Sequence, residues 1–238
     1  LSVTRIAYHL SKYTTMGINW SAKFYPENEE KREEIHQLAG ELFSLLQKCY
    51  DATNLLIEAV ERHLPGRNFS KISIDNDQTI KTNCDVIKQR LHEIEEYLEY
   101  HKLEVKSRMS PEHFEKMHSI DLSFLDKLDI VKKVTKGSIS IGYTASALFL
   151  MGAIRTGLVL TSLADRVGTL AACAIAAVIV TTIFIGIDMI IGAITGAIER
   201  DKLDAALGEY KQAVDTLKPA ADTFYDNISE IRVILESI

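Results

Sequence analysis

After Pro26 the chain carries apolar residues spaced alternately three and four positions apart. Pro26 and the acidic residues after it suit the first turn of a helix, since proline lacks an amide hydrogen and acids favour the positive end of the helix dipole. The alternating spacing is the heptad pattern of packed helices. We predict a long helix that ends at Leu64-Pro65-Gly66. Its apolar seam is Ile35, Leu38, Leu42, Leu45, Cys49, Ala52, Leu56 and Ala59.

Two further stretches repeat the heptad pattern. One begins at Asp75 or Asp77, either of which is a suitable N-cap. Its seam is Ile80, Cys84, Ile87, Leu91, Ile94, Leu98, His101 and Val105. The other begins near Glu199, and we expect Pro219 to kink it. Its seam is Leu203, Leu207, Tyr210, Val214, Leu217, Ala221, Phe224, Ile228, Ile231, Leu235 and Ile238.

A shorter and less regular helix is predicted from Ser110 onward. Ser110 is a suitable N-cap, and Pro111 fits the first helical position. The apolar positions that follow are Phe114, Met117, Phe124, Leu128 and Val131, and they lead into the most apolar part of the chain. We predict one helix that continues through these positions.

The block from Gly137 to Ile198 contains four charged residues, Arg155, Asp165, Arg166 and Asp188. It divides into two uncharged runs, 137–154 and 167–187. The second run has 21 residues, and a helix of that length spans a hydrocarbon core of about 30 Å. A helix that is apolar on all sides is either a membrane span or the centre of a core. We expect the block to contact a bilayer.

These elements predict an all-α protein: an elongated antiparallel helical bundle or coiled coil with a central apolar helical hairpin. Antiparallel packing is expected because short loops join neighbouring helices that way. The expected parts are a disordered or leader segment (1–23), N-terminal coiled-coil helices (24–136), a membrane-inserting hairpin (137–198) and a C-terminal coiled-coil helix (199–238).

Small residues and one acid mark the candidate site for membrane contact and self-association. Gly192 and Gly196 form a G-x-x-x-G pair, which lets helix backbones approach closely in a bilayer, and Gly186 precedes them. Asp188 lies at the membrane interface if the span is Val167–Ile187, and it needs a partner or an aqueous lumen if the span extends further. The site residues are Val167, Gly186, Ile187, Asp188, Gly192 and Gly196.

Charge indicates the kind of partner and the topology. The formal net charge of −6 argues against nucleic-acid binding. For a hairpin, the positive-inside rule compares the basic residues on the two sides. Lys132, Lys133, Lys136, Arg200 and Lys202 lie on one side, against Arg155 and Arg166 on the other. This distribution favours helical arms in the cytosol, whereas a single span leaves the count balanced.

No motif for catalysis or phosphate binding occurs. Two Glu-x-x-His spacings, Glu33/His36 and Glu115/His118, resemble ligands of di-iron bundles. Both pairs lie beside apolar seams, so we expect them to face solvent. The sequence therefore predicts a protein that is not an enzyme and has no metal, no cofactor and no small-molecule substrate.

The cysteines and the first residues add two expectations. Seam positions predict buried free thiols at Cys49 and Cys84, with a disulfide between them as the alternative. If translation starts at Met16, the segment Met16–Ser21 fits the N-myristoylation pattern, which makes Gly17 a candidate lipidation site. A chance match in an unstructured leader is the alternative.

Four segments, in order, resemble the single-pass membrane and coiled-coil domain-containing protein 3 family of vertebrates. They are Phe24-Tyr25-Pro26-Glu27-Asn28 followed by Arg32-Glu33-Glu34, then Asp51-Ala52-Thr53-Asn54, then Asp77-Gln78-Thr79-Ile80-Lys81-Thr82-Asn83-Cys84-Asp85, and finally Gly186-Ile187-Asp188-Met189-Ile190. The resemblance covers roughly residues 24–238. It implies a membrane span and coiled coils, but no activity and no site residue.

Three functions remain open from the sequence. The first is a membrane protein that inserts its apolar hairpin and self-associates through heptad helices, in the extreme as an α-helical pore. The second is a constitutively anchored coiled-coil scaffold or tether without conduction. The third is a helical bundle whose core is the apolar hairpin. The expected partners are a lipid bilayer and a second copy of the chain or a coiled-coil partner.

Overall fold

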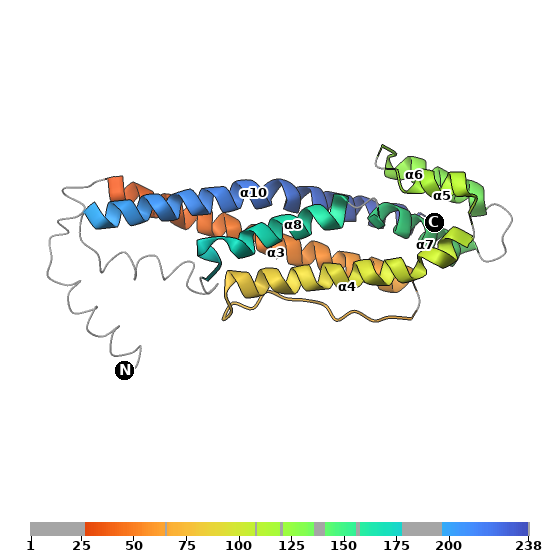
Figure 1. Cartoon of the computed structure of the whole chain (residues 1–238), viewed down its shortest axis with the longest axis horizontal. Helices are drawn as coiled ribbons and strands as arrows, with labels where there is room; N and C mark the ends of the chain where they lie inside the picture. The colour runs from red at the N-terminus through yellow and green to blue at the C-terminus, as the bar shows by residue number, and fades with distance from the viewer. Residues whose placement is uncertain are drawn as a thin grey trace.

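The computed structural model describes residues 27–64, 66–107, 109–119, 121–135, 141–155, 158–177 and 197–237. These residues form helices that pack against one another, and the described part contains no β-strand, so the prediction of an all-α protein is confirmed (Figure 1). The elements are α3 (Glu27–His63), α4 (Ile80–Ser107), α5 (Pro111–Met117), α6 (Phe124–Thr135), α7 (Ile141–Arg155), α8 (Leu158–Ala172), the 3₁₀ helix η1 (Ala174–Ala177) and α10 (Ala197–Glu236).

The two longest helices, α3 and α10, pack along each other for most of their length. The predicted seam positions of α3 are buried, with Leu38 half-buried, and those of α10 from Leu203 to Leu235 are buried apart from the half-buried Leu207. Pro219 lies inside α10 on its exposed side. Both heptad seams are thus used within a single chain.

The helices α3 and α10 run in the same direction, which corrects the predicted antiparallel arrangement for this pair. Four ion pairs join them: Lys31–Asp204, Glu34–Lys211, Glu41–Lys218 and Lys48–Asp222. The residue numbers rise together along both helices, as they do only in a parallel pair. Short loops impose antiparallel packing only on consecutive helices. α3 and α10 are the first and last helices described, so no short loop constrains them.

A long return loop makes α4 parallel to α3 as well. Residues 66–79 run back along α3, where Lys71 contacts Glu58 and the side chain of Asn54 bonds to both backbone groups of Ile72. α4 then begins beside the middle of α3, where the Tyr50 hydroxyl donates to the Asn83 carbonyl at 2.9 Å. Figure 1 shows the loop under α4 and the two helices pointing the same way.

The start of α4 differs from the prediction. The helix begins at Ile80, and Thr79 caps it, because the Thr82 amide donates to the Thr79 hydroxyl at 3.1 Å. The carboxylate of Asp75 instead accepts from the Asp77 amide at 2.9 Å, which makes a turn. Both predicted caps thus lie in the loop that precedes the helix.

The predicted single helix from Ser110 is divided into two. Ser110 caps α5, with Pro111 at its first position, as predicted. α5 ends at Met117, and a second start signal follows. Ser123 accepts from the Asp126 amide at 3.2 Å, and the Asp126 carboxylate accepts from the Ser123 amide at 3.3 Å. This reciprocal capping box begins α6 at Phe124 and had not been identified in the sequence.

The two helices of the apolar block pack on different partners. α7 lies mainly on α6, with further contacts to α4, α10 and α3, whereas α8 lies between α4 and α10. α8 runs opposite to α3, α4 and α10 (Figure 1). The predicted hairpin over 137–198 stays a prediction, because residues 136–140, 156–157 and 178–196 lie outside the described part. The leader segment 1–23 and Gly17 lie outside it too.

Candidate functional site

The segment Ala145–Ile154 of α7 is enclosed on every side. All ten residues from Ala145 to Ile154 are buried, and none of them is charged. Phe149 and Leu150 are fully buried, and the Phe149 ring meets the Phe124 ring of α6 edge-on, with centroids 6.5 Å apart. A helix that is apolar all round must be covered by other elements or by lipid. Here the amphipathic helices of the same chain cover it.

A lysine lies in the contact between α6 and α7. The side chain of Lys127 is 1% exposed, and its Nζ donates to the carbonyl oxygen of Gly152 at 3.4 Å. Burial disfavours the charged amine and lowers the pKa of Lys127 from 10.5 to about 8. Charged side chains are rarely fully buried in protein cores. Lys127 therefore distinguishes this contact from an ordinary apolar interface.

Gly152 allows α5 to approach α7 at the same place. A Cβ atom at this position would lie 2.2 Å from the Met117 methyl carbon and 3.4 Å from the Met117 carbonyl oxygen. The missing side chain makes room for Met117, which is itself buried. α5 and α6 thus both rest on one short segment of α7.

The predicted helix over 167–187 is wrong for the part that the structure describes. α8 starts earlier, at Leu158, and ends at Ala172, after which η1 follows. The amide of Ile175 donates to a carboxylate oxygen of Glu209 on α10 at 3.1 Å, so a side chain takes the bond that a continuous helix would supply. Val167 is fully buried within the bundle.

Most of the predicted membrane and self-association residues lie outside the described part of the chain. They are Gly186, Ile187, Asp188, Gly192 and Gly196. Among the described helices, none is both long enough and apolar enough to cross a membrane.

The Glu-x-x-His pairs do not form a metal site among the described residues. Glu33 and Glu115 are exposed, in agreement with the predicted outward orientation, whereas His36 and His118 are half-buried. His118 Nδ1 lies 2.6 Å from the Phe114 carbonyl oxygen. No group of three or more His, Cys, Asp or Glu side chains gathers within the described residues.

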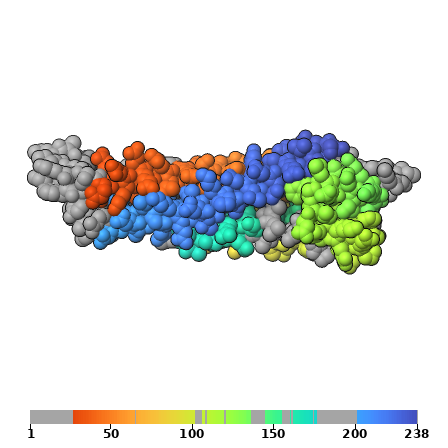
Figure 2. Space-filling view, turned by 90° about the horizontal axis from the view of Figure 1, so that it is seen from above, coloured from red at the N-terminus to blue at the C-terminus, as the bar shows by residue number. Residues whose placement is uncertain are grey.

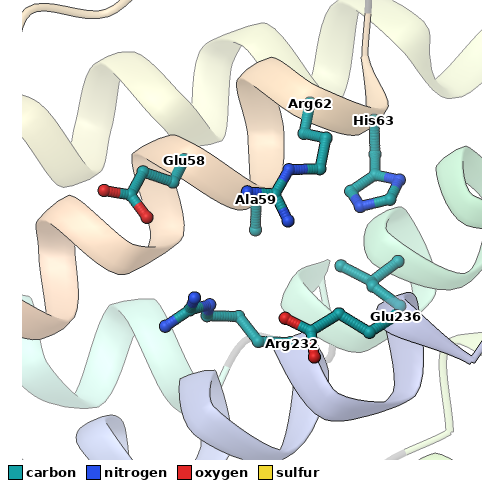
Figure 3. Close-up of a pocket in the computed structure, with 7 residues that line it drawn as sticks. Glu58, Ala59, Arg62, His63, Arg232 and Glu236 are labelled. Atoms are coloured by element: carbon teal, nitrogen blue, oxygen red, sulfur yellow. The ribbon is translucent and has the colours of Figure 1, made fainter.

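A charged cleft lies where α3 and α10 end side by side. Because the two helices are parallel, their last turns meet there, and Figure 3 shows Arg62 and His63 of α3 facing Glu236 of α10. Burial, and secondarily the charge of Arg62, lowers the pKa of His63. The cleft is lined by Glu58, Ala59, Arg62, His63, Arg232, Leu235 and Glu236.

Residues 31–185 match the model of a family described as a protein of unknown function, DUF4533. The chain belongs to this family. The match extends from the first turns of α3 beyond η1 and includes the return loop, α7 and α8, whereas α10 follows it. No solved structure matches the chain.

Lys127, Asn54 and Asn83 were not singled out from the sequence. Lys127 does carry a signal, because it lies three residues after Phe124 and four before Val131, at a seam position of α6. A charged residue at a seam position indicates a specific role. Asn54 and Asn83 occur in two of the segments that carry the family resemblance, but the pattern alone did not indicate what they bind.

The cysteines give a first prediction. Cys49 and Cys84 are free and buried, as predicted, and burial raises the pKa of each thiol to about 12. Since the thiolate is the reactive form, we expect only the partly exposed Cys173 to react readily with Ellman's reagent at pH 8 in the folded chain. In urea all three thiols should react. Rapid reaction of all three without denaturant would contradict the described burial.

Proposed function

We propose that this is a non-enzymatic membrane protein, in which an elongated helical bundle covers an apolar hairpin (137–198) and then inserts it into a bilayer. The observation that carries the proposal is the complete burial of the uncharged segment Ala145–Ile154 by amphipathic helices. This arrangement keeps an apolar helix away from water until another apolar environment replaces its cover. The resemblance to the single-pass membrane and coiled-coil domain-containing protein 3 family supports the same assignment.

Self-association is part of the proposal. The seams of α3 and α10 are buried against each other within one chain, with ion pairs such as Lys218–Glu41 along the contact. When the bundle opens, these seams become available to a second copy. Association would then accompany insertion, with Gly192 and Gly196 as the contact between inserted helices. The basic residues on the side of the arms favour their location in the cytosol.

A second candidate is a constitutively anchored scaffold or tether that conducts nothing. The run 167–187 has three hydroxyl residues, Thr169, Thr181 and Thr182, which would point in directions about 100° or more apart if the run formed one continuous helix in a bilayer. They make no polar stripe of the kind that lines a lumen. This observation favours an anchor over a wide pore.

The test uses the full chain and liposomes of phosphatidylcholine and phosphatidylserine loaded with a self-quenching dye. Flotation with the liposomes that resists carbonate at high pH supports insertion. Dye release in the same samples favours the permeabilising form, and its absence favours the anchor. Recovery of all the protein away from the liposomes would overturn both candidates and leave the apolar block as a core.

A charge in the apolar run gives the second prediction. Val178→Asp places a carboxylate near the middle of 167–187, and an acid at the centre of a membrane helix costs about 2.5–3.5 kcal/mol. We expect carbonate-resistant binding to fall by at least tenfold. The matched control is Val233→Asp on α10, where the side chain is 67% exposed and the substitution should leave binding unchanged. Equal binding of both variants would exclude insertion of this run.

A further inference from the structure

The helices α5 and α6 form a separate unit at one end of the bundle. Figure 2 shows them as a cluster beside the C-terminal part of α10, and Figure 1 shows them on the side of α7 away from α4. α6 makes more contacts with α7 than with any other element, and smaller contacts with α5 and α10. The unit is therefore attached to the bundle chiefly through the apolar helix.

We propose that α5 and α6 are a lid on α7, and that Lys127 keeps the lid releasable because its amine is buried against α7 whenever the lid is closed. This inference rests on the proposed function and deepens it, since it names the element that must move before the apolar helix meets a bilayer. The remaining cover of α7 comes from the long helices, which also hold one another.

The closed lid contains both favourable and unfavourable contacts. Phe124 packs edge-on against Phe149, and Met117 fills the space beside Gly152. The amine of Lys127 donates to the Gly152 carbonyl at 3.4 Å, which is longer than the usual N–H···O distance of about 2.7–3.2 Å. A charged amine loses its hydration in this place, whereas water surrounds it when the lid is open.

The part of α7 whose side chains the structure describes, Ala145–Ile154, has no titratable group that could face the amine. On α6 itself, Asp126, Asp129, Lys132 and Lys133 are exposed. On α5, Glu112 pairs with Lys116 at 2.7 Å, Glu115 is exposed and His113 lies 3.0 Å from the Ser110 hydroxyl. His118 follows α5 and lies beside the Phe114 carbonyl.

The last part of α10, which lies next to α6, also carries titratable and charged side chains. Three of them are exposed acids, Asp226, Glu230 and Glu236. The other two are the half-buried Tyr225 and Arg232.

The sign of the pH effect follows from the two states of Lys127. Its pKa is about 8 with the lid closed, against an ordinary value of 10.5. The amine therefore binds a proton more readily in the open state, and opening becomes more favourable as the pH falls from 10.5 to 8. Over that whole window the opening constant rises by at most about 300-fold, and below pH 8 it levels off. At neutral pH the closed lid holds a charged amine and is at its weakest.

The third prediction is tested by hydrogen exchange of the full chain without lipid. Protection factors of the α6 and α7 amides, corrected for the intrinsic rate at each pH, should fall by about 25-fold between pH 9.5 and pH 7. In Lys127→Met, which keeps an unbranched side chain of nearly the same length and removes its charge, this dependence should disappear, and protection at pH 7 should rise. Lys132→Met, an exposed position on the same helix, is the matched control and should retain the profile of the original chain.

The outcomes separate the lid from the membrane function. A flat profile in the original chain overturns the lid, whether or not Lys127→Met folds, and so does a profile that persists in that variant. If the profile is as expected but neither protein floats with liposomes, the lid stands and the proposed function fails. If both hold, Lys127→Met should insert more slowly than Lys132→Met.

Discussion

Phe149→Ala is expected to lower the free energy of unfolding by about 3–5 kcal/mol, the usual effect of removing a fully buried aromatic ring. The side chain is completely buried on α7 and meets Phe124 edge-on. Its removal deletes the ring contact with Phe124 of α6 and leaves a cavity. Urea unfolding followed by circular dichroism measures the change. Since whole domains are stable by only about 5–15 kcal/mol, this variant should be near its limit of stability.

Two companion variants show whether the loss arises from packing on α7. Phe149→Leu keeps most of the apolar volume and should cost less than about 1.5 kcal/mol. Val233→Ala removes an exposed apolar group on α10 and should stay within about 0.5 kcal/mol. If Phe149→Ala were as mild as Val233→Ala, α7 would not be the enclosed centre of the bundle.

The helices were predictable from the sequence because their apolar spacing depends only on local geometry. The seam from Ile35 to Ala59 and the seam from Leu203 to Leu235 became the contact between α3 and α10. The end of α3 near Pro65 also follows from local chemistry. The relative direction of two packed helices was not predictable in this way, because an apolar seam packs equally well on a parallel or an antiparallel partner. The heptads therefore could not show that α3, α4 and α10 run the same way.

The predicted helix boundaries were wrong where the local sequence offered more than one cap or where a residue far away in the sequence bonds to the backbone. Asp75 and Asp77 are good caps, but Asp75 is used in a turn, and Thr79 caps α4 instead. The run from Val167 appeared long enough to cross a bilayer, yet its first residues continue α8, which ends at Ala172. Just beyond this end, the backbone amide of Ile175 donates to Glu209 of α10, a helix far away in the sequence. Composition cannot indicate a contact of this kind.

The candidate site was predicted only as an apolar block, and its cover was not predicted. The uncharged segment of α7 was evident from the sequence, but its enclosure by α6 depends on the capping box at Ser123 and on the space beside Gly152. Lys127 was predictable as an unusual residue, because it is a charged side chain at an apolar seam position of α6. Gly186, Asp188 and the glycines that follow are still predicted on sequence alone.

A second large loss of stability is expected in the return loop, because one side chain holds its last part, from Asp75 to Thr79. Asn83 is 1% exposed. Its side-chain oxygen Oδ1 accepts from the backbone amide of Asp75 at 2.8 Å. Its side-chain nitrogen Nδ2 donates to the backbone carbonyls of Asp75 at 2.9 Å and Thr79 at 3.0 Å. The Tyr50 hydroxyl of α3 reaches the same side chain at 3.1 Å. Asn83 thus fixes the point at which the chain turns from the loop into a helix parallel to α3.

Asn83→Ala should therefore cost about 2–4 kcal/mol, because it removes the four hydrogen bonds that this buried side chain makes to Asp75, Thr79 and Tyr50. Tyr50→Phe, which removes only the hydroxyl, should cost about 1 kcal/mol, and the two changes together should cost less than their sum because they share one network. Asn76→Ala, at an exposed position in the same loop, is the matched control and should stay within about 0.5 kcal/mol. Urea unfolding of the four variants gives these values. A loss at Asn83 no greater than that at Asn76 would mean that the loop is held elsewhere, and the parallel course of α3 and α4 would then need another cause.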